Sequence, residues 1–182
     1  MLKRALVIID IQNDYFAGGR MPLVGSEAAA ARAADLLGAF RASGEPVFHV
    51  QHIATRAGAT FFLPETDGAR IHAAVAPRDG EAVIVKHHPN AFRGTTLAEQ
   101  LRTAGIGHLL FAGMMTHMCI DTSVRAAADL GFECSLAADA CATRDLAWGG
   151  QTVAAAQVQA AYLAALSGAF ARVAAAAELQ ST

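Results

Sequence analysis

Short apolar runs that alternate with helix-like segments constrain the fold of this chain more than any other feature. The runs are rich in Val, Ile, Leu and Ala and lack polar residues at alternate positions, which is typical of strands buried on both faces. The segments between them carry apolar residues three and four positions apart, as in a helix that packs on a sheet. This alternation predicts right-handed βαβ units and a parallel sheet.

The same patterns predict where the elements lie and which fold class they form. Thr96 and Glu99 predict a capping box at the start of the second helix. No GxGxxG motif follows the first strand, so the dinucleotide-binding version of this architecture lacks its fingerprint. The expected class is α/β: a three-layer α/β/α sandwich with a central, mainly parallel, Rossmann-like sheet of about six strands, in a single domain over residues 1–182. We predict strands at 5–9, 47–50, 82–85, 109–113, 133–138 and 169–174, and helices at 26–43, 97–104, 116–130 and about 150–166.

The composition argues against several classes of protein. The net charge is −2, the pI is about 6.4 and the arginines are scattered, so we expect no nucleic-acid partner. No apolar run approaches membrane-spanning length, and the first residues reach acidic and amide side chains too early for a signal peptide. These features predict a cytoplasmic protein without a membrane partner. The three cysteines, without CxxC spacing, indicate neither a disulfide framework nor a zinc knuckle.

Chemically active side chains follow three different predicted strands. Asp10 follows the first strand, Lys86 the third, and Cys119 lies in the turn after the fourth. Parallel strands bring their carboxyl ends to one edge, where ligands bind in open α/β sheets. A proton acceptor, a positive charge and a nucleophile would meet there. Taken singly, Asp10 could equally cap a turn or pair with an arginine, but the coincidence of three such residues favours a catalytic site.

Cys119 is expected in the first turn of a helix that has Thr116 as its N-cap, because Ile120 and Val124 follow at four-residue spacing. The helix dipole and the charge of Lys86 would favour a thiolate there, which predicts a thiol pKa below the ordinary cysteine value. The alternative is that Cys119 is a small buried apolar residue.

Four blocks spread over nearly the whole chain carry more specific information: ALVIIDIQNDYF, VIVKHHPNAFRGTTL, GMMTHMCIDTSVRAAADLG and ADACATRD. Together they resemble the isochorismatase-like cysteine hydrolases, which include nicotinamidases, ureidoacrylate and N-carbamoylsarcosine amidohydrolases, and isochorismatases. The resemblance implies the family's catalytic triad at Asp10, Lys86 and Cys119. It also implies a cis peptide between Met114 and Met115, which would aim the N–H of Met115, with that of Cys119, into an oxyanion hole.

The resemblance further implies cleavage of a C–N bond in a small amide or ureido substrate, through a thioester on Cys119 and without a cofactor. Family members that hydrolyse the vinyl ether of isochorismate can lack the cysteine, so its presence favours a C–N bond. Two alternatives stay open: a vinyl-ether hydrolase, and a non-catalytic member whose cysteine is oxidised reversibly. The resemblance also implies a homo-oligomer, a dimer or larger, with a small-molecule substrate.

The second predicted strand leads into a region where nicotinamidases bind a metal ion through an Asp-x-His element. Here the region reads His49-Val50-Gln51-His52, without an aspartate. If the strand continues through it, His49 and His52 point to opposite faces. Because metal ligands must converge on one point, we expect no metal site.

The irregular segment 51–82 and the residues beyond the strand-end motifs are expected to shape the substrate pocket. Phe61, Phe62 and Leu63 in this segment either line the pocket, or anchor the loop or fill a subunit interface. The other aromatic candidates could equally belong to the core or to a subunit interface. The further candidates for the pocket wall are Gln12, Phe16, Asn90, Phe92 and Trp148.

Overall fold

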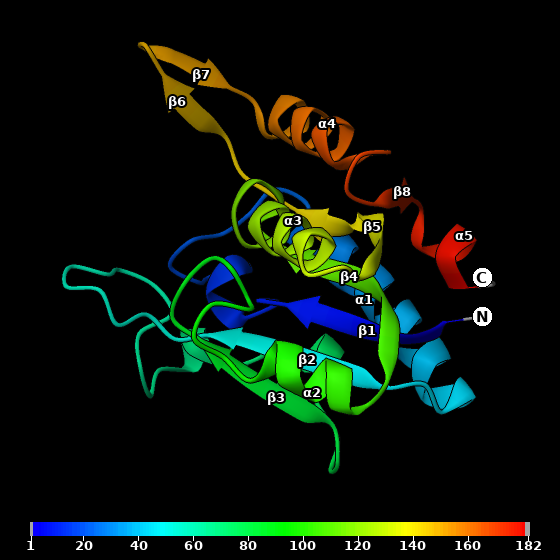
Figure 1. Ribbon diagram of the computed structural model, residues 1–182. Coiled ribbons are helices and arrows are strands. Elements are labelled where there is room, and N and C mark those ends of the chain that lie inside the picture. The colour runs from blue at the N-terminus through cyan, green and yellow to red at the C-terminus, as the bar shows by residue number, and fades with distance from the viewer. Residues whose placement is uncertain (1, 181–182) are drawn as a thin grey trace.

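The computed structural model describes residues 2–180. Its centre is a sheet of six parallel strands in the order β3-β2-β1-β4-β5-β8, in agreement with the alternating sequence pattern (Figure 1). The strands of this sheet are β1 (Lys3–Ile9), β2 (Val47–His52), β3 (Ala82–Lys86), β4 (Ile106–Met114), β5 (Glu133–Ala142) and β8 (Arg172–Ala174). The helices are α1 (Ser26–Ser43), α2 (Leu97–Thr103), α3 (Asp121–Asp129), α4 (Ala155–Leu166) and α5 (Ala176–Gln180).

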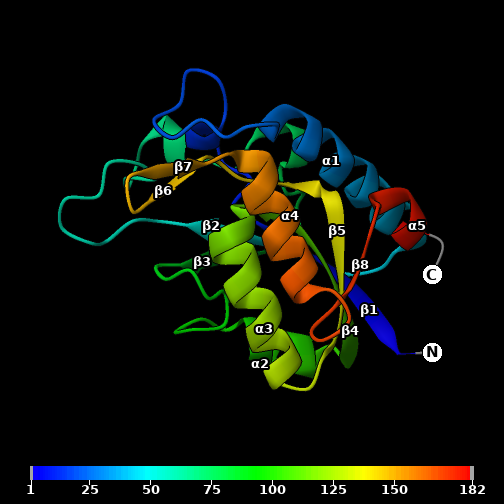
Figure 2. The same ribbon diagram turned by 90° about the horizontal axis from the view of Figure 1, so that it is seen from above.

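Helices cover both faces of the sheet and complete three layers (Figure 2). On one face, apolar residues of α1 and α5 share a core cluster with Leu6 and Ile8 of β1. On the other face, residues of α2, α3 and α4 share a second cluster with Val7 and Ile9. Successive residues of β1 therefore alternate between the two clusters, as the period of two in a strand requires. The predicted α/β/α sandwich is confirmed.

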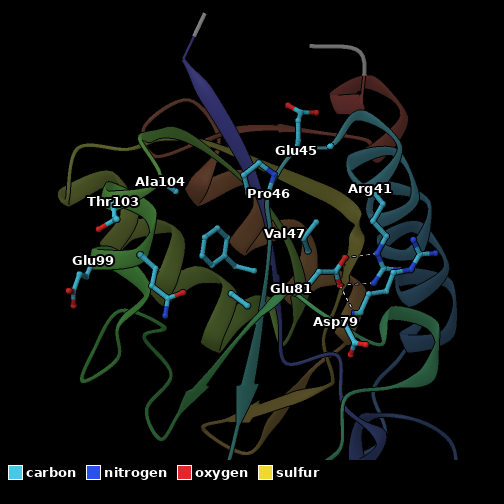
Figure 3. Close-up of a pocket in the computed structure, with 15 residues that line it drawn as sticks. Arg41, Glu45, Pro46, Val47, Asp79, Glu81, Glu99, Thr103 and Ala104 are labelled. Carbon is cyan, nitrogen blue, oxygen red and sulfur yellow. Dashed lines mark hydrogen bonds and ion pairs between the residues drawn. The ribbon is translucent and has the colours of Figure 1, made fainter.

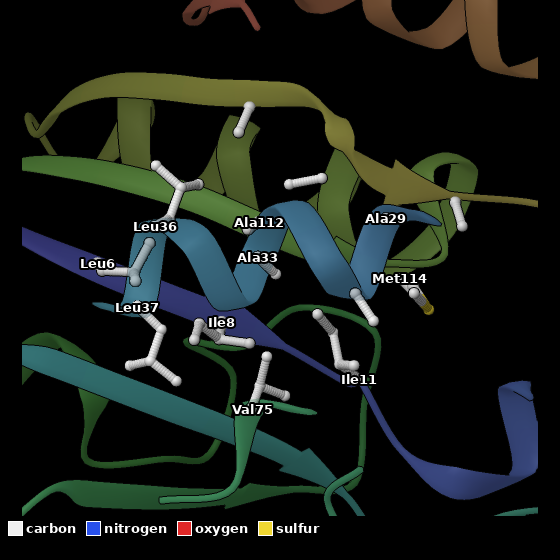
Figure 4. Packing of buried hydrophobic residues seen from close by; sticks show 14 of the residues in the cluster. Leu6, Ile8, Ile11, Ala29, Ala33, Leu36, Leu37, Val75, Ala112 and Met114 are labelled. Carbon is white, nitrogen blue, oxygen red and sulfur yellow. The ribbon is translucent and has the colours of Figure 1, made fainter. Parts of the chain in front are cut away.

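Helix α1 shows how the sequence pattern builds one of these layers (Figure 4). Ala33 and Leu36 lie on the face of α1 that meets Leu6 and Ile8, and all four side chains are buried. Burial of each large apolar side chain contributes roughly 1.5–3 kcal/mol to stability. The helix ends where Gly44 adopts a left-handed φ of 71°, so the predicted helix boundary is correct.

The strand order changes direction at β1, which places several strand ends around one crevice. The chain builds β2 and β3 on one side of β1 and then crosses over to place β4 on the other side. Such a crevice, outside the carboxyl ends of the strands, is where open α/β sheets bind ligands. Ile9 lies in register with Gly113, and His52 with Lys86, so the residues at these strand ends are close together.

The segment before α4 differs from the prediction. A helix was expected from about Gly150, but α4 begins only at Ala155, because β6 (Leu146–Trp148) and β7 (Gln151–Val153) form an antiparallel hairpin before it. Gly149 and Gly150, with φ of 57° and 77°, make the two-residue turn, and both need the left-handed region that glycine adopts readily. The hairpin projects from the body of the molecule (Figure 1).

The predicted capping box of α2 is also absent. Thr96 is the N-cap residue, but its side chain caps no backbone N–H; its Oγ1 accepts a hydrogen bond from the Gln100 side chain at 2.9 Å. The hydroxyl of Thr95 accepts from the N–H of Leu97 instead, at 3.3 Å. The hydroxyl of Thr95, and not that of Thr96, therefore caps a free N–H group in the first turn of α2.

Among the helices that the structure describes, none combines the length and the apolar character needed to cross a lipid bilayer.

Candidate active site

The three candidate residues Asp10, Lys86 and Cys119 converge at the carboxyl edge of the sheet. Nζ of Lys86 lies 2.6 Å from Oδ2 of Asp10 and 3.3 Å from Sγ of Cys119. Asp10 and Lys86 are completely buried, and Cys119 is 6% exposed. A nucleophile, a carboxylate and an ammonium group therefore share a space with little water, where charges interact more strongly than at the surface.

Different strands position these side chains. Asp10 directly follows β1, and its positive φ of 53° turns the chain away from the sheet. Lys86 is the last residue of β3, and β2 lies between β3 and β1. Its side chain therefore passes His52 at the end of β2 before it reaches Asp10. The long stem of a lysine makes this reach possible.

Cys119 lies in a π-helical turn, Thr116–Ile120, and not in the first turn of an α-helix. Helix α3 begins only at Asp121, so the N-cap predicted at Thr116 is wrong. The Thr116 hydroxyl instead donates to Oε1 of Gln159 in α4 at 2.6 Å. The wider turn cannot be distinguished from an α-helix by apolar spacing alone, and turns of this kind are frequent at functional sites.

The junction between β4 and this turn has two unusual backbone features. The Met114–Met115 peptide is cis, as the resemblance implies. Gly113 has a φ of 143°, and a Cβ atom there would lie 2.0 Å from the carbonyl oxygen of Ile9. Only glycine therefore allows β4 to approach β1 so closely. The oxyanion hole formed by the N–H groups of Met115 and Cys119 stays a prediction.

Burial dominates the acid–base properties of the site. It raises the pKa of the Cys119 thiol above its ordinary value; Asp10 raises this pKa further, and Lys86 offsets only part of the increase. Burial also raises the pKa of Asp10, against the opposing effect of Lys86. For Lys86 burial lowers the pKa, but its two acidic partners outweigh that effect and the pKa is raised. The site therefore favours the neutral thiol of Cys119, contrary to the low thiol pKa expected from the sequence.

The Asp10 carboxylate is placed to accept a proton. Lys86, whose Nζ lies 2.6 Å from Oδ2, and the neighbouring Cys119 both act to lower the pKa of this carboxyl group, against the larger effect of burial. Both carboxylate oxygens are buried without a well-formed hydrogen bond from the described residues. A buried acceptor in this state is energetically unfavourable, and a proton taken from the neighbouring thiol would relieve it.

His52 is a fourth member of this cluster, which sequence patterns did not identify. Its Nδ1 lies 2.9 Å from Nζ of Lys86. Ligand atoms of Asp10, His52 and Cys119 lie within 4.8 Å of one another, as in sets that bind a metal ion. However, Nζ of Lys86 contacts all three residues, so a metal ion would have to displace a buried ammonium group. The residues present therefore do not fit a metal ion.

Tyr15 is a second neighbour of the triad that the sequence analysis did not single out. Burial raises the pKa of its phenol well above the ordinary value, and the nearby Cys119 and Asp10 raise it further. Its ring contacts Phe61 and Phe62, with centroids 5.9 Å and 4.6 Å apart. These three rings form an aromatic cluster beside the triad. Tyr15 lies in the same sequence block as Asp10, which is the only signal that could have identified it.

Two of the predicted pocket residues, Gln12 and Phe16, connect the loop after β1 to the irregular segment. Gln12 is fully buried, and its side-chain amide binds the backbone of His52 and Ala69. Phe16 is 6% exposed and stacks on the ring of His72, with centroids 3.8 Å apart. Contact between either side chain and a substrate stays a prediction.

The other three pocket candidates lie in different surroundings. Oδ1 of Asn90 accepts a hydrogen bond from the N–H of Phe92 at 2.8 Å, within a turn. Phe92 is partly buried, and its ring stacks on Phe132 with centroids 6.2 Å apart. Trp148 is 87% exposed at the end of β6, next to the hairpin turn. Their part in a pocket is likewise still a prediction.

Broad hollows lie elsewhere on the molecule. One of about 770 Å³, between the ends of α1 and α2, is lined by Pro46, Val47 and the Arg41–Glu81 ion pair (Figure 3). Another, of about 910 Å³, includes His108 and the start of β1. Both lie at the amino ends of the strands, and neither contains a residue of the triad. The candidate active site is therefore identified by its chemistry and not by the size of a hollow.

The fold and this site describe an α/β protein with ionisable and nucleophilic groups at the carboxyl edge of a parallel sheet. A model of the isochorismatase domain matches residues 4–178, and the chain belongs to the isochorismatase family of hydrolases. It is 50% identical over 169 residues to the isochorismatase-family protein YddQ of Bacillus subtilis strain 168, covering 93% of this chain and 94% of that protein.

Two further comparisons extend this relationship. A crystal structure of an isochorismatase-family hydrolase from Oleispira antarctica is 54% identical, with a TM-score of 0.95, and covers 99% of this chain and 97% of that one. The ureidoacrylate amidohydrolase RutB of Variovorax paradoxus strain S110 is 27% identical over 169 residues, covering 75% of this chain and 67% of that protein.

Proposed function

We propose that this protein is a cysteine-dependent hydrolase that cleaves the C–N bond of a small amide or ureido substrate. The observation that carries the proposal is the position of the buried Nζ of Lys86, 2.6 Å from Asp10 and 3.3 Å from Cys119. This arrangement joins a nucleophile to a proton acceptor and a fixed positive charge. The similarity to a ureidoacrylate amidohydrolase supports a C–N bond as the target.

The proposed reaction proceeds through a thioester. Asp10 takes the thiol proton as Sγ of Cys119 attacks the substrate carbonyl, and the carbonyl oxygen becomes an oxyanion near the N–H groups of Met115 and Cys119. As the C–N bond breaks, Asp10 returns the proton to the departing nitrogen. A water molecule then loses a proton to Asp10 and attacks the thioester, which frees the acid and restores the thiol. Lys86 stays protonated and holds the two anionic groups in place.

The raised pKa of Cys119 is compatible with this sequence of steps. If the thiol transfers its proton to Asp10 only during the attack, Cys119 does not exist as a free thiolate between turnovers. The raised pKa of Asp10 makes it a better proton acceptor than an ordinary aspartate. The redox alternative from the sequence analysis needs a reactive thiolate, which this environment disfavours.

The proposal predicts that Cys119→Ala abolishes turnover without loss of folding. Purified protein would be incubated with a panel of small primary amides and ureido compounds, and release of ammonia or amine would be measured. Cys134→Ala provides the control, because this cysteine is also buried but lies in β5 at the other end of the strand. We expect Cys134→Ala to retain activity.

Two outcomes would contradict the proposal. Turnover of an amide by Cys119→Ala would exclude the thioester route. A wild-type product that contains a new carbonyl compound and no amine, with isochorismate as the substrate, would identify the vinyl-ether alternative.

A further inference from the structure

Three possible acceptor atoms surround the ammonium group of Lys86, one in an ion pair and two in hydrogen bonds. A protonated lysine carries three donors and no acceptor. Nζ lies 2.6 Å from Oδ2 of Asp10, 3.3 Å from Sγ of Cys119 and 2.9 Å from Nδ1 of His52. Two of these partners belong to the proposed reaction, and the third has no role in it. The third contact therefore needs its own explanation.

His52 can accept this hydrogen bond only as a neutral ring. Because all the hydrogens on Nζ are donors, Nδ1 must be unprotonated, and the ring proton then lies on Nε2. A protonated His52 would place two positive charges 2.9 Å apart in a buried site. Its other charged or titratable neighbours are His87 and His88, which follow β3, and Asp10 and Cys119 across the site. Burial, and then Lys86, lowers the pKa of His52 to about 3, so the neutral form is stable at ordinary pH.

Gln12 fixes the part of β2 that carries this ring. Its Nε2 donates to the carbonyl oxygen of His52 at 2.9 Å, and its Oε1 accepts from the N–H of the same residue at 2.8 Å. The same Nε2 also donates to the carbonyl of Ala69 at 2.7 Å. A completely buried side chain thus holds the last residue of β2 by both of its backbone groups. The position of the imidazole is therefore set from two directions, by Gln12 through the backbone and by Lys86 through the ring.

We propose that His52 is a positioning residue for Lys86. Its neutral Nδ1 takes one N–H of the ammonium group, so that the other two remain directed at Asp10 and Cys119. An acidic side chain at this place would also accept the hydrogen bond, but its negative charge would compete with Asp10 for the lysine. A neutral acceptor fixes the orientation of the ammonium group and leaves its whole positive charge to the two reacting groups. This inference deepens the proposed function, because it assumes that Lys86 acts on Cys119.

A matched pair of variants separates the charge of the acceptor from its shape. In His52→Asn and His52→Asp, Oδ1 can occupy the place of Nδ1, and the two side chains have nearly the same size. The readout is the rate at which iodoacetamide alkylates Cys119 between pH 7 and pH 10, resolved from Cys134 and Cys141 by peptide mapping. Since this reaction follows the thiolate, it reports the influence of Lys86 without any knowledge of the substrate. A chelator is present throughout, because an aspartate at this position adds a possible metal ligand.

We expect the Asn variant to react within about threefold of the wild-type rate. The Asp variant should react at least about tenfold more slowly at the same pH, because a second carboxylate raises the thiol pKa by about one unit or more. Equal rates for the two variants would overturn the proposal, since they would show that the charge of the acceptor at this position has no influence on Lys86 and Cys119. Such a result would leave the proposed hydrolase intact, because that rests on loss of turnover in Cys119→Ala.

A second measurement does not depend on the reactivity of Cys119. In protein labelled with ¹⁵N at histidine, the His52 ring is assigned by its absence from the spectrum of His52→Asn. We expect the Nδ1 signal to remain that of an unprotonated nitrogen from pH 8 to pH 5, and to begin titrating at higher pH in Lys86→Met. An Nδ1 that carries a proton at pH 8, or a wild-type titration at the ordinary histidine pKa of about 6.5 that Lys86→Met does not change, would overturn the proposal.

Discussion

The missing side chain of Gly113 sets the distance between two strands at the candidate active site. Its φ of 143° is in a region that other residues rarely adopt, and an added Cβ would lie 2.0 Å from the carbonyl oxygen of Ile9. Ile9 precedes Asp10, and Gly113 precedes the turn that carries Cys119. The spacing between the turn that carries Cys119 and the strand that leads to Asp10 therefore depends on a residue outside the candidate triad.

Gly113→Ala should lower the free energy of unfolding by roughly 2–5 kcal/mol, because backbone strain and a clash with main-chain atoms add together. Urea denaturation at neutral pH would measure the change. Gly38→Ala is the control: Gly38 lies on the exposed side of α1 with nothing within 4 Å of the added Cβ. That variant should gain roughly 0.5–1 kcal/mol from helix propensity. Similar small effects in both variants would show that β4 can move away from β1 at little cost.

At the scale of elements, Glu81 joins α1 to the start of the sheet, at the edge opposite the candidate site. Its two carboxylate oxygens each lie 2.7 Å from the guanidinium of Arg41 in α1, and one lies 3.0 Å from Nε2 of His49 in β2. His49 points away from the face that His52 occupies, as the continued strand predicts. Burial lowers the pKa of His49, so its neutral ring donates from Nε2. A single carboxylate thus connects a helix to a buried strand.

The hydrogen bond from Arg41 lowers the pKa of Glu81 from 4.5 to about 2. A depressed carboxyl pKa stabilises the fold above the unfolded value, and this contribution is lost as pH falls from about 4.5 towards 2. Glu81→Gln should therefore destabilise the protein at pH 7 by about 1–3 kcal/mol, and the difference from wild type should shrink between pH 4.5 and pH 2.

Urea denaturation of both proteins at several pH values would check this expectation. Asp35→Asn serves as the matched control, because Asp35 pairs with Arg32 at the surface with both side chains more than half exposed. That change should alter stability by less than about 0.5 kcal/mol. A Glu81→Gln difference that stayed constant from pH 7 to pH 2 would show that the carboxylate charge contributes nothing.

At the scale of the whole molecule, the two edges of the sheet carry different features. The candidate triad and the β6–β7 hairpin follow the carboxyl ends of β1, β3, β4 and β5, while the hollows of about 770 and 910 Å³ lie at the amino ends. The hairpin extends outward from the helical layers (Figure 1). Trp148, the single tryptophan of the chain, lies on this hairpin and is 87% exposed. Val24, which is not part of the hairpin, is also strongly exposed. Large apolar side chains that are exposed in this way often mark contact sites.

The homo-oligomer implied by the resemblance predicts a concentration-dependent fluorescence of Trp148. In a dilute monomer the emission should lie close to that of the urea-unfolded chain, because the indole is in water in both states. Association through the hairpin would shift the emission to shorter wavelength as protein concentration rises, in parallel with the mass from light scattering. A larger mass without any change in emission would place the interface elsewhere. Trp148→Ser should change the stability of the monomer by no more than about 0.5 kcal/mol.

The sequence by itself determined the six strands of the main sheet, most of the helices and the edge at which Asp10, Lys86 and Cys119 meet. These follow from local periodicity and from the rule that parallel strands end at one edge. The end of α1 was likewise predictable, since glycine is favoured where a helix adopts a left-handed residue. Strand boundaries differ from the prediction in places, since β5 continues to Ala142 and β8 begins only at Arg172. Periodicity could not show the β6–β7 hairpin within an alanine-rich segment, nor the wider turn around Cys119, because their backbone hydrogen bonds are not encoded in apolar spacing.

Only the tertiary structure decided how the site is charged and supported. Burial depends on all three layers together, and it raises the thiol pKa of Cys119 where a local view of the helix and lysine predicts a lower one. The contact between His52 and Lys86 arises from the pairing of two strands that are more than thirty positions apart in sequence. The amide of Gln12 is likewise engaged by backbone groups from distant segments. Such effects depend on which groups exclude water and meet in space, and no stretch of sequence contains that information alone.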